Sequence, residues 1–276
     1  MSQVIMITGC SSGIGRNLAS RLSSTGYTVV ATARDVDTLA DLPVALRLPL
    51  DVTRPESIQA AVEKTIQRFG CIDVLVNNAG YAVRGAVEEV PVEQAQRMFD
   101  TNLFGVMRMV QAVVPHMRAQ KAGRIINISS VVGKLVTPAN GTYSASKFAL
   151  EGMSNALRLE LAPFGIQVVL VEPGSIKTPF HAIMEKNGAE IFANPTSPYQ
   201  PLYRRYEKVT ADMRRQEAMP EAVSRVVQQV VESRQLKARY VAGFPFSGRL
   251  VLFLGSSAWD LVVRQLFKIN QMEIQP

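Results

Sequence analysis

The segment "ITGCSSGIGR", residues 7–16, decides how this chain folds. It follows a short apolar run typical of a buried strand, and it opens a stretch with helical spacing. Its glycines, Gly9, Gly13 and Gly15, permit a tight turn and close approach of a neighbouring backbone. The helix that follows offers free N–H groups to a phosphate. Although the spacing Gly-x3-Gly-x-Gly differs from the G-x-G-x-x-G fingerprint, a turn of this kind between strand and helix predicts a nucleotide site.

The same alternation continues along the chain. Short β-branched runs occur at Val4–Ile7, Thr28–Thr32, Ala45–Leu50, Val74–Val76, Arg124–Ile128, Gln167–Val171 and Arg239–Ala242. Helical spacing occurs at Gly15–Leu22, Ser57–Phe69, Val92–Met117, Tyr143–Leu161 and Glu221–Ser233. Strands that are apolar on both faces and alternate with helices indicate a parallel sheet covered on both sides. We therefore predict an α/β, doubly wound (Rossmann) sheet of about seven strands in a single domain over residues 1–276.

Two segments interrupt the alternation. An insertion over about residues 174–220 carries aromatic and methionine side chains, and long insertions of this kind often form lids. A C-terminal extension over about residues 244–276 is apolar but interrupted by Gly255, Asp260 and Arg264, so it is too broken for a membrane span. We expect this extension to cover a pocket; a dimer contact and a membrane-surface anchor are the alternatives.

The composition is that of a globular protein, with 47% hydrophobic and 19% charged residues. The net charge is +7, but the basic residues are scattered and the only doublets are Arg204-Arg205 and Arg214-Arg215. We therefore expect no nucleic acid partner. Cys10 and Cys71 form no disulfide framework and no signal peptide is visible, so a cytoplasmic setting is expected. The two histidines are too few for a histidine-rich metal site, and no metal is expected.

The glycine-rich segment also fits a second pattern. Gly9-Cys10-Ser11-Ser12-Gly13 satisfies G-x-S-x-G, the nucleophile elbow of α/β hydrolases, in which Ser11 would be the nucleophile and His181 its base. The elbow normally follows several strands, whereas a single strand precedes Ser11. No HGGG-like segment supplies an oxyanion hole. A serine hydrolase is therefore the disfavoured alternative.

The end of the second strand indicates the cofactor. NAD sites place a carboxylate there for the ribose 2′-hydroxyl, while an arginine suits a 2′-phosphate. The strand ends without a carboxylate and Arg34 follows, whose guanidinium can bind a phosphate and stack on adenine. NADP(H) is favoured, and Asp35, the next residue, leaves NAD(H) as the alternative.

A tyrosine and a lysine lie four residues apart in "TYSASKFAL", residues 142–150. A tyrosine has an unperturbed pKa near ~10 and is a poor base at neutral pH. A cation beside it favours the phenolate, and residues four apart share one helix face. Tyr143 and Lys147 are therefore either a core tyrosine beside a solvated lysine or an activated acid–base pair.

These features occur together in a known family. The chain resembles the short-chain dehydrogenases/reductases over nearly its whole length. The matching motifs, in the order and spacing of that family, are Thr8-Gly9-x3-Gly13-x-Gly15, Asn77-Asn78-Ala79-Gly80, Asn102, Ser130, Tyr143-x3-Lys147 and Pro173-Gly174. Within the family, the chain looks most like the NADP(H)-dependent steroid, retinoid and aldehyde reductase branch, because of "GCSSGIG", Arg34 and the lipophilic insertion.

The resemblance implies hydride transfer between NADP(H) and an alcohol or carbonyl compound. Tyr143 would donate or accept the proton, and Lys147 would lower the tyrosine pKa and hydrogen-bond the nicotinamide ribose. Ser130 would hold the substrate oxygen; it is preferred to Ser129 because its thirteen-residue step to Tyr143 matches the family. Asn102 would link Lys147 to solvent through water.

The resemblance also implies a set of cofactor-binding residues. Besides Arg34, Tyr143 and Lys147, they are Gly9, Ser11, Ser12, Gly13, Ile14, Gly15, Asp51, Val52, Asn78, Ala79, Gly80, Pro173, Gly174, Ile176 and Thr178. Asp51 and Val52 would contact the adenine, although Asp51 suits a helix N-cap almost as well. The segment from Pro173 to Thr178 would contact the nicotinamide amide, and Asn77 would border the adenine ribose.

Apolar side chains predict the substrate class. Those of the insertion, with Phe148 and Leu135, predict a pocket for a lipophilic steroid, retinoid, aldehyde or alcohol.

Two alternative functions are considered. A nucleotide sensor would be expected to lack Tyr143 or Lys147, and both are present. A membrane-attached lipid enzyme is the other alternative. The resemblance implies a homodimer or homotetramer, with the helical stretches Val92–Met117 and Tyr143–Leu161 as contacts.

Overall fold

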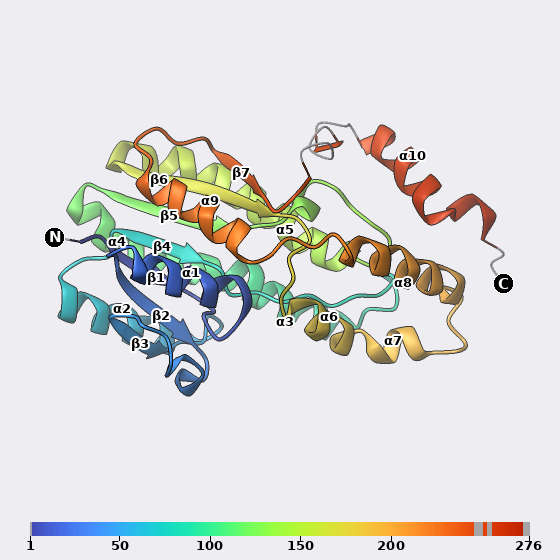
Figure 1. The fold of residues 1–276 in the computed structure, drawn as a ribbon, viewed down its shortest axis with the longest axis horizontal. Helices are drawn as coiled ribbons and strands as arrows, with labels where there is room; N and C mark the ends of the chain where they lie inside the picture. The colour runs from blue at the N-terminus through green and yellow to red at the C-terminus, as the bar shows by residue number, and fades with distance from the viewer. Residues whose placement is uncertain (1, 246–250, 253–255, 273–276) are drawn as a thin grey trace.

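The computed structural model describes residues 2–245, 251–252 and 256–272. At its centre, seven parallel strands form a sheet in the order β3-β2-β1-β4-β5-β6-β7 (Figure 1). The strands are β1 (Val4–Ile7), β2 (Thr28–Ala33), β3 (Leu46–Pro49), β4 (Val74–Asn77), β5 (Gly123–Ile128), β6 (Ile166–Pro173) and β7 (Arg239–Ala242). This confirms the predicted doubly wound sheet. The order reverses between β1 and β4, where such sheets bind ligands at the carboxyl ends of their strands.

Helices cover both faces of the sheet. One face carries α1 (Gly13–Ser24) and α9 (Glu221–Glu232), and the other carries α2 (Pro55–Phe69), α4 (Gly105–Gln120) and α5 (Gly141–Leu161). The other described helices are α3 (Val92–Phe99), α6 (Phe180–Asn187), α7 (Ala189–Ala193), α8 (Gln200–Arg214) and α10 (Ser256–Phe267). Short 3-10 turns are η1 (Val36–Leu39), η3 (Val131–Gly133), η4 (Ala162–Phe164) and η6 (Ile269–Gln271).

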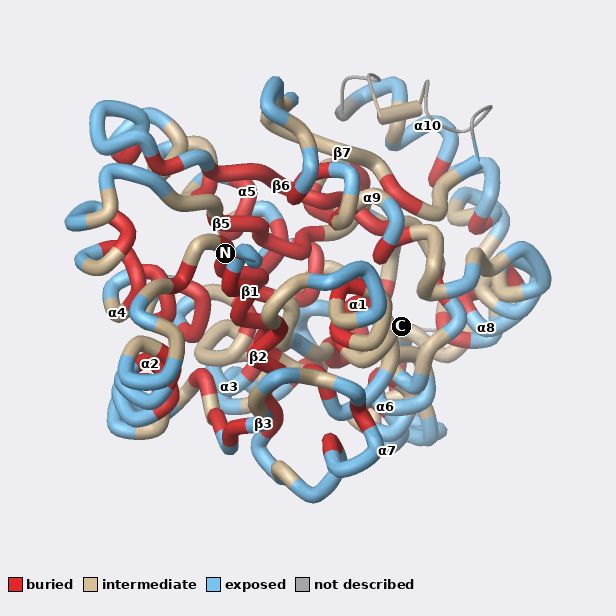
Figure 2. The backbone as a smooth tube through the Cα atoms, turned by 60° about the vertical axis from the view of Figure 1, so that its left-hand side comes forward, coloured by how far each residue is buried: buried red, intermediate tan, exposed pale blue. Residues whose placement is uncertain are grey.

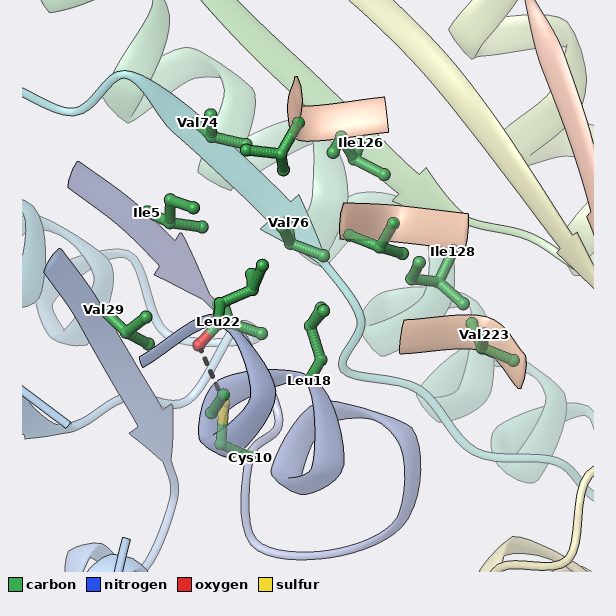
Figure 3. Packing of buried hydrophobic residues seen from close by; sticks show 14 of the residues in the cluster. Ile5, Cys10, Leu18, Leu22, Val29, Val74, Val76, Ile126, Ile128 and Val223 are labelled. Atoms are coloured by element: carbon green, nitrogen blue, oxygen red, sulfur yellow. Dashed lines mark hydrogen bonds between the residues drawn. The ribbon is translucent and has the colours of Figure 1, made fainter. Parts of the chain in front are cut away.

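The core forms one layer against each face of the sheet. Because side chains alternate along a strand, Ile5 and Ile7 point toward α1 and α9, whereas Val4 and Met6 point toward α2 and α4. Figure 3 shows the first layer, in which Leu18 of α1 packs on the strand residues. The inner strands β1, β2, β4, β5 and β6 are buried along most of their length (Figure 2), which is why they are rich in apolar residues, whereas the edge strands β3 and β7 are only partly buried.

The stretch predicted as one helix over Val92–Met117 is interrupted. A π-helical segment, η2 (Asp100–Phe104), lies between α3 and α4. Asn102 is in this segment, where its side chain accepts a hydrogen bond from the backbone N–H of Tyr81 at 3.0 Å and donates one to the Tyr81 carbonyl at 2.9 Å. π-helical turns of this kind are frequent at functional sites.

The insertion is helical rather than an open loop. After β6 the chain forms α6, α7 and α8, which lie together beyond the carboxyl ends of the strands (Figure 1). Tyr203 of α8 stacks on Phe192 of α7, and Tyr206 of α8 stacks on Phe267 of α10. The C-terminal helix is therefore fixed to the insertion. The part of the predicted extension at 246–250, 253–255 and 273–276 lies outside the described residues.

Helix α10 is amphipathic. It buries Val263 and Phe267 against α8 and exposes Leu261. Trp259 donates a hydrogen bond from Nε1 to the carbonyl oxygen of Val136 at 2.7 Å, which ties α10 to the loop after η3. Within the described ranges, none of the helices has both the length and the apolar character that crossing a membrane requires.

Candidate functional site

The turn after β1 is shaped for close contact. Gly9 and Gly13 have φ angles of +74° and +57°, which favour glycine. A Cβ atom on Gly9 would lie 2.9 Å from Cα of Ala79, and one on Gly15 would lie 2.3 Å from the carbonyl oxygen of Gly9. The turn therefore presents backbone rather than side chains at the switch point of the sheet.

The N-terminus of α1 faces this turn and suits an anion. Ser12 precedes the helix without a side-chain capping bond, and the first turn contains no acidic residue. Ser11 and Ser12 are exposed, and Ile14 is half-buried in the first turn. Uncapped N–H groups and the positive end of the helix dipole would bind a phosphate, so the residues fit a dinucleotide.

Thr8, to which the sequence assigns no role, joins the turns after β1 and β4. Its Oγ1 accepts hydrogen bonds from the backbone N–H groups of Asn78 and Ala79 at 3.0 and 3.1 Å. The Asn78 side chain donates in return to the carbonyl oxygens of Thr8 and Gly9 at 2.9 and 3.0 Å. A Cβ atom on Gly80 would lie 3.0 Å from Oδ1 of Asn102, which extends the same assembly to η2.

Ser130, Tyr143 and Lys147 come together at the carboxyl end of β5. Tyr143 and Lys147 lie on the first turns of α5, with 8% and 7% of their surfaces exposed. Nζ of Lys147 donates a hydrogen bond to the carbonyl oxygen of Ile128 at 2.9 Å and lies 5.9 Å from the centre of the Tyr143 ring. Ser130 caps η3 and donates from Oγ to the carbonyl oxygen of Pro173 at 3.4 Å. The pair is therefore not a core tyrosine beside a solvated lysine.

Burial dominates the electrostatics of this group. Burial raises the pKa of the Tyr143 phenol, and a hydrogen bond with Ser130 opposes that rise. The sequence predicts that Lys147 lowers the pKa of Tyr143. In the structure, burial has the larger effect and the pKa of Tyr143 is raised. Burial lowers the pKa of Lys147 to about 8, and the Glu151 carboxylate acts in the opposite direction. Burial disfavours the charged form of each group, so it raises the pKa of a phenol and lowers that of an ammonium.

The amide of Asn102 is occupied by protein groups. Besides its two bonds with Tyr81, it donates to Oγ of Ser146 at 3.1 Å. The side chain thus fastens η2 and α5 to the loop after β4. Both N–H groups of the amide are used in these bonds, so a water link from Asn102 to Lys147 would have to use an oxygen or the backbone N–H of Asn102.

The residues expected around the adenine lie at the ends of β2 and β3. Arg34 is exposed. Burial raises the pKa of Asp51, but hydrogen bonds from Thr53, followed by the charges of Arg34 and Arg54, lower it below its usual value. Asp51 does not cap α2, because Arg54 holds the N-cap position. Its carboxylate instead accepts bonds from the N–H and Oγ1 of Thr53 at 2.9 and 2.7 Å. Val52 is buried, and a Cβ atom on Gly105 would lie 2.7 Å from it.

The segment after β6 reaches back to the glycine turn. Thr178 lies against Gly13, where an added Cβ atom would be 3.2 Å from the threonine side chain. Gly174 donates a backbone bond to the carbonyl oxygen of Ala242 at 2.9 Å. The side chain of Ile176 is buried in the core, so only its backbone is left for a ligand. A cavity of about 470 Å³ beside this junction is lined in part by Gly13, Lys177 and Thr178.

Helix α6 covers the Tyr143 side chain. The ring of Phe180 lies 5.6 Å from that of Tyr143, and Met184 belongs to the same apolar cluster. His181, the histidine that a hydrolase triad with Ser11 would need, contacts Oε1 of Glu217 at 3.1 Å instead. Across the ranges that the structure describes, groups of three His, Cys, Asp or Glu residues that could hold a metal are absent.

Comparison with known proteins finds relatives along the whole chain. The family described as short chain dehydrogenase matches residues 3–189. A 3-ketodihydrosphingosine reductase of Bacteroides thetaiotaomicron is 46% identical over 178 residues, which are 64% of this chain and 65% of that protein. Uncharacterized oxidoreductase YusZ of Bacillus subtilis is 34% identical over 95% of this chain and 98% of its own length. A short-chain dehydrogenase from Streptomyces avermitilis superimposes with a TM-score of 0.79 at 30% identity, over 99% of both chains.

Proposed function

The chain belongs to the short-chain dehydrogenase/reductase family, and from this membership and the site geometry we propose that it transfers hydride between NADP(H) and a lipophilic alcohol or carbonyl compound. Membership makes it an oxidoreductase acting on CH–OH groups, with a nicotinamide cofactor expected. The choice of NADP(H), the substrate class and the residue roles are the proposal.

One observation carries the proposal. Tyr143 and Lys147 are buried together on α5 beside Ser130, at the end of the sheet that also holds the glycine turn. A buried phenol and a buried ammonium are costly as structural elements alone. A site that exchanges a proton with a substrate oxygen explains why both the phenol of Tyr143 and the ammonium of Lys147 are buried there.

A bound nicotinamide supplies or accepts the hydride, and the residues of the chain handle the proton and the charge on oxygen. Ser130 would donate a hydrogen bond from Oγ to the substrate oxygen. In reduction Tyr143 would give its phenolic proton to that oxygen, and in oxidation it would take the alcohol proton. Lys147, as an ammonium near the Tyr143 ring, would stabilise the phenolate left after reduction.

Arg34 supports NADP(H) as the cofactor. It is exposed directly after β2, and within the described part of the chain its guanidinium forms no ion pair. The carboxylate of Asp35, which left NAD(H) open, accepts a bond from the N–H of Asp37 at 3.1 Å and caps η1. A free guanidinium suits a 2′-phosphate, and an occupied carboxylate is a weaker partner for a ribose hydroxyl. NAD(H) is the alternative.

The surroundings of Tyr143 support a lipophilic substrate. Phe180 and Met184 of α6, with Val90 and Met98, form an apolar cluster around the tyrosine. A relative named 3-ketodihydrosphingosine reductase agrees with a keto compound as substrate. The test is a panel of lipophilic ketones, aldehydes and alcohols followed by absorbance of the reduced nicotinamide, with NADP(H) and NAD(H) in parallel. Turnover of small polar alcohols alone would contradict the substrate class.

We also propose that two copies associate through α4 and α5. Phe104 of η2, Met107 of α4, and Phe148 and Leu159 of α5 are exposed, and a surface hollow of about 560 Å³ is lined in part by Phe104 and Phe99. Large apolar side chains exposed on these elements would be buried in a subunit contact. Light scattering after gel filtration measures the mass, and a monomer at micromolar concentration would contradict the association.

A further inference from the structure

Four charged side chains form a cluster behind the proposed active site. Arg239 of β7 donates a hydrogen bond from Nε to Oε2 of Glu151 on α5 at 3.0 Å, and the same Nε lies 3.3 Å from Oε1 of Glu172 on β6. Nζ of Lys134, after η3, lies 3.0 Å from that Glu172 oxygen. Two carboxylates and two cations thus join four elements, and their formal charges cancel.

The two carboxylates of the cluster are buried. Glu172 is 0% exposed and Glu151 is 6% exposed. Desolvating each carboxylate costs several kcal/mol, and buried ion pairs are often no more stable than apolar residues of similar volume. A gain in stability therefore does not explain why this cluster is charged. A contribution of the cluster to the chemistry of the adjoining active site explains it better.

The cluster is continuous with the site. Glu172 precedes Pro173, whose carbonyl accepts the hydrogen bond of Ser130. A Cβ atom on Gly133 would lie 3.1 Å from Cγ of Glu151 and 3.4 Å from the carbonyl oxygen of Lys147, so η3 packs directly on this part of α5. Glu151 itself lies four residues after Lys147 on α5, on the same face of the helix.

We propose that Glu151 is a positioning residue whose carboxylate, held in place by Arg239, keeps Lys147 in the ammonium form. The inference rests on the proposed function, in which that ammonium stabilises the Tyr143 phenolate. It assigns to Glu151 no contact with substrate or cofactor. Glu172 and Lys134 would act by holding Arg239 and the loop of Ser130.

The charges around Lys147 favour Glu151 as the determining group. Tyr143 and Glu151 lie on its own helix, while Lys134 after η3, Glu172 of β6 and Arg239 of β7 belong to the cluster around Glu151. Burial lowers the pKa of Lys147 to about 8, and of these neighbours Glu151 opposes that shift. Without the Glu151 charge the pKa falls further, so the ammonium is lost at a lower pH.

The test compares Glu151→Gln with wild type in the pH dependence of kcat between about pH 6 and pH 10. We expect the alkaline decline in rate to move down by about one pH unit, the size of effect of one nearby opposite charge. Glu172→Gln is the matched control, because it removes a buried carboxylate of the same cluster from another element. We expect it to lower the melting temperature and leave the alkaline decline near its wild-type position.

A second measurement does not depend on turnover. The pH dependence of unfolding is compared for wild type against Lys147→Met, and for Glu151→Gln against the double variant with Lys147→Met. The contribution of Lys147 to the pH dependence of the unfolding free energy should begin at a lower pH in the Glu151→Gln background. If Glu151→Gln does not fold, Glu151→Gln combined with Arg239→Gln removes both charges of the pair and should show a smaller downward shift, because losing the Arg239 cation favours the Lys147 ammonium. An unshifted Lys147 titration, or equal shifts in the Glu151 and Glu172 variants, would overturn the inference, whereas an inactive wild type would count against the proposed function alone.

Discussion

The ammonium of Lys147 lies 5.9 Å from the centre of the Tyr143 ring, and the two side chains are buried together on one face of α5. Burial shifts their pKa values in opposite directions, raising that of the phenol and lowering that of the ammonium to about 8. Both shifts favour the neutral form of each group. The hydrogen bond with Ser130 and the charge of Glu151 act against these shifts, so the neighbours of the pair determine how readily a proton moves.

Replacing Tyr143 by phenylalanine removes the hydroxyl and keeps the ring that packs against Phe180. We expect kcat to fall about a thousandfold, because general acid–base catalysis contributes rate factors of that order. Cofactor affinity, measured by fluorescence of the bound reduced nicotinamide, should change little. A variant that retains a rate near wild type would contradict the acid–base role.

The buried Lys147 should make stability depend on pH. Its pKa falls from the ordinary value of 10.5 to about 8 on folding, so between these values the unfolded chain binds more protons than the folded one. The unfolding free energy should therefore rise with pH over this window, by roughly 3 kcal/mol from this group.

Lys147→Met is the control for this pH dependence, because Tyr143 and other groups also titrate in alkali and are common to both proteins. Denaturant unfolding at pH 7.5 and pH 10 measures the difference. Wild type should gain stability relative to the variant as the pH increases. Parallel behaviour of the two proteins would show that folding does not lower the pKa of Lys147.

Replacing Arg34 by alanine should separate the two cofactors. A guanidinium bound to a 2′-phosphate contributes about 1.5–3 kcal/mol, so NADPH binding should weaken by roughly one to two orders of magnitude. NADH lacks that phosphate, and its binding should change little. Titration calorimetry with both nucleotides measures the difference. Equal losses for both would count against a phosphate contact at Arg34.

The glycine turn should not tolerate a methyl group at Gly15. The added Cβ atom would lie 2.3 Å from the Gly9 carbonyl oxygen and 2.4 Å from Nδ2 of Asn78. These two atoms are hydrogen-bonded to each other and connect the turn after β1 to the turn after β4. We expect Gly15→Ala to lose about 1–3 kcal/mol of stability and to bind nucleotide weakly.

Gly152→Ala provides the comparison for this variant. Gly152 lies within α5, and a Cβ atom there meets nothing within 4 Å. Alanine has the higher helix propensity, so this variant should be neutral or more stable by up to about 1 kcal/mol. Thermal unfolding of both variants measures the contrast, and similar melting temperatures would contradict the close packing at Gly15.

The C-terminal helix should contribute to the stability of the insertion. Phe267 is buried and stacks on Tyr206 of α8, so Phe267→Ala should cost about 3 kcal/mol. Leu261 on the same helix is 69% exposed, and Leu261→Ala should change stability by less than about 0.5 kcal/mol. Denaturant midpoints compare the two. Equal, small effects would show that α10 is not packed on α8 in solution.

Particular elements show how far sequence reasoning reaches. The strand at Val4–Ile7 and the helix that begins near Tyr143 follow from apolar periodicity and local spacing, and the structure has both. The π-helical break at Asp100–Phe104 could not be predicted, because it accompanies bonds from Asn102 to the backbone of Tyr81, a residue outside the helix. The sequence contains only a weak indication of the charged cluster: Glu172 interrupts an apolar run, and Glu151 lies four residues after Lys147.

Local sequence is enough to specify the alternation of strands and helices, the conformation of the glycine turn and the shared helix face of Tyr143 and Lys147. Each of these depends on residues close together along the chain. The contacts of Glu151 with Arg239 and of Phe180 with Tyr143 depend on the folded chain, because 88 and 37 positions separate these partners. The charge state of a side chain depends on its burial and on the groups around it, and the folded sheet and its helices set both.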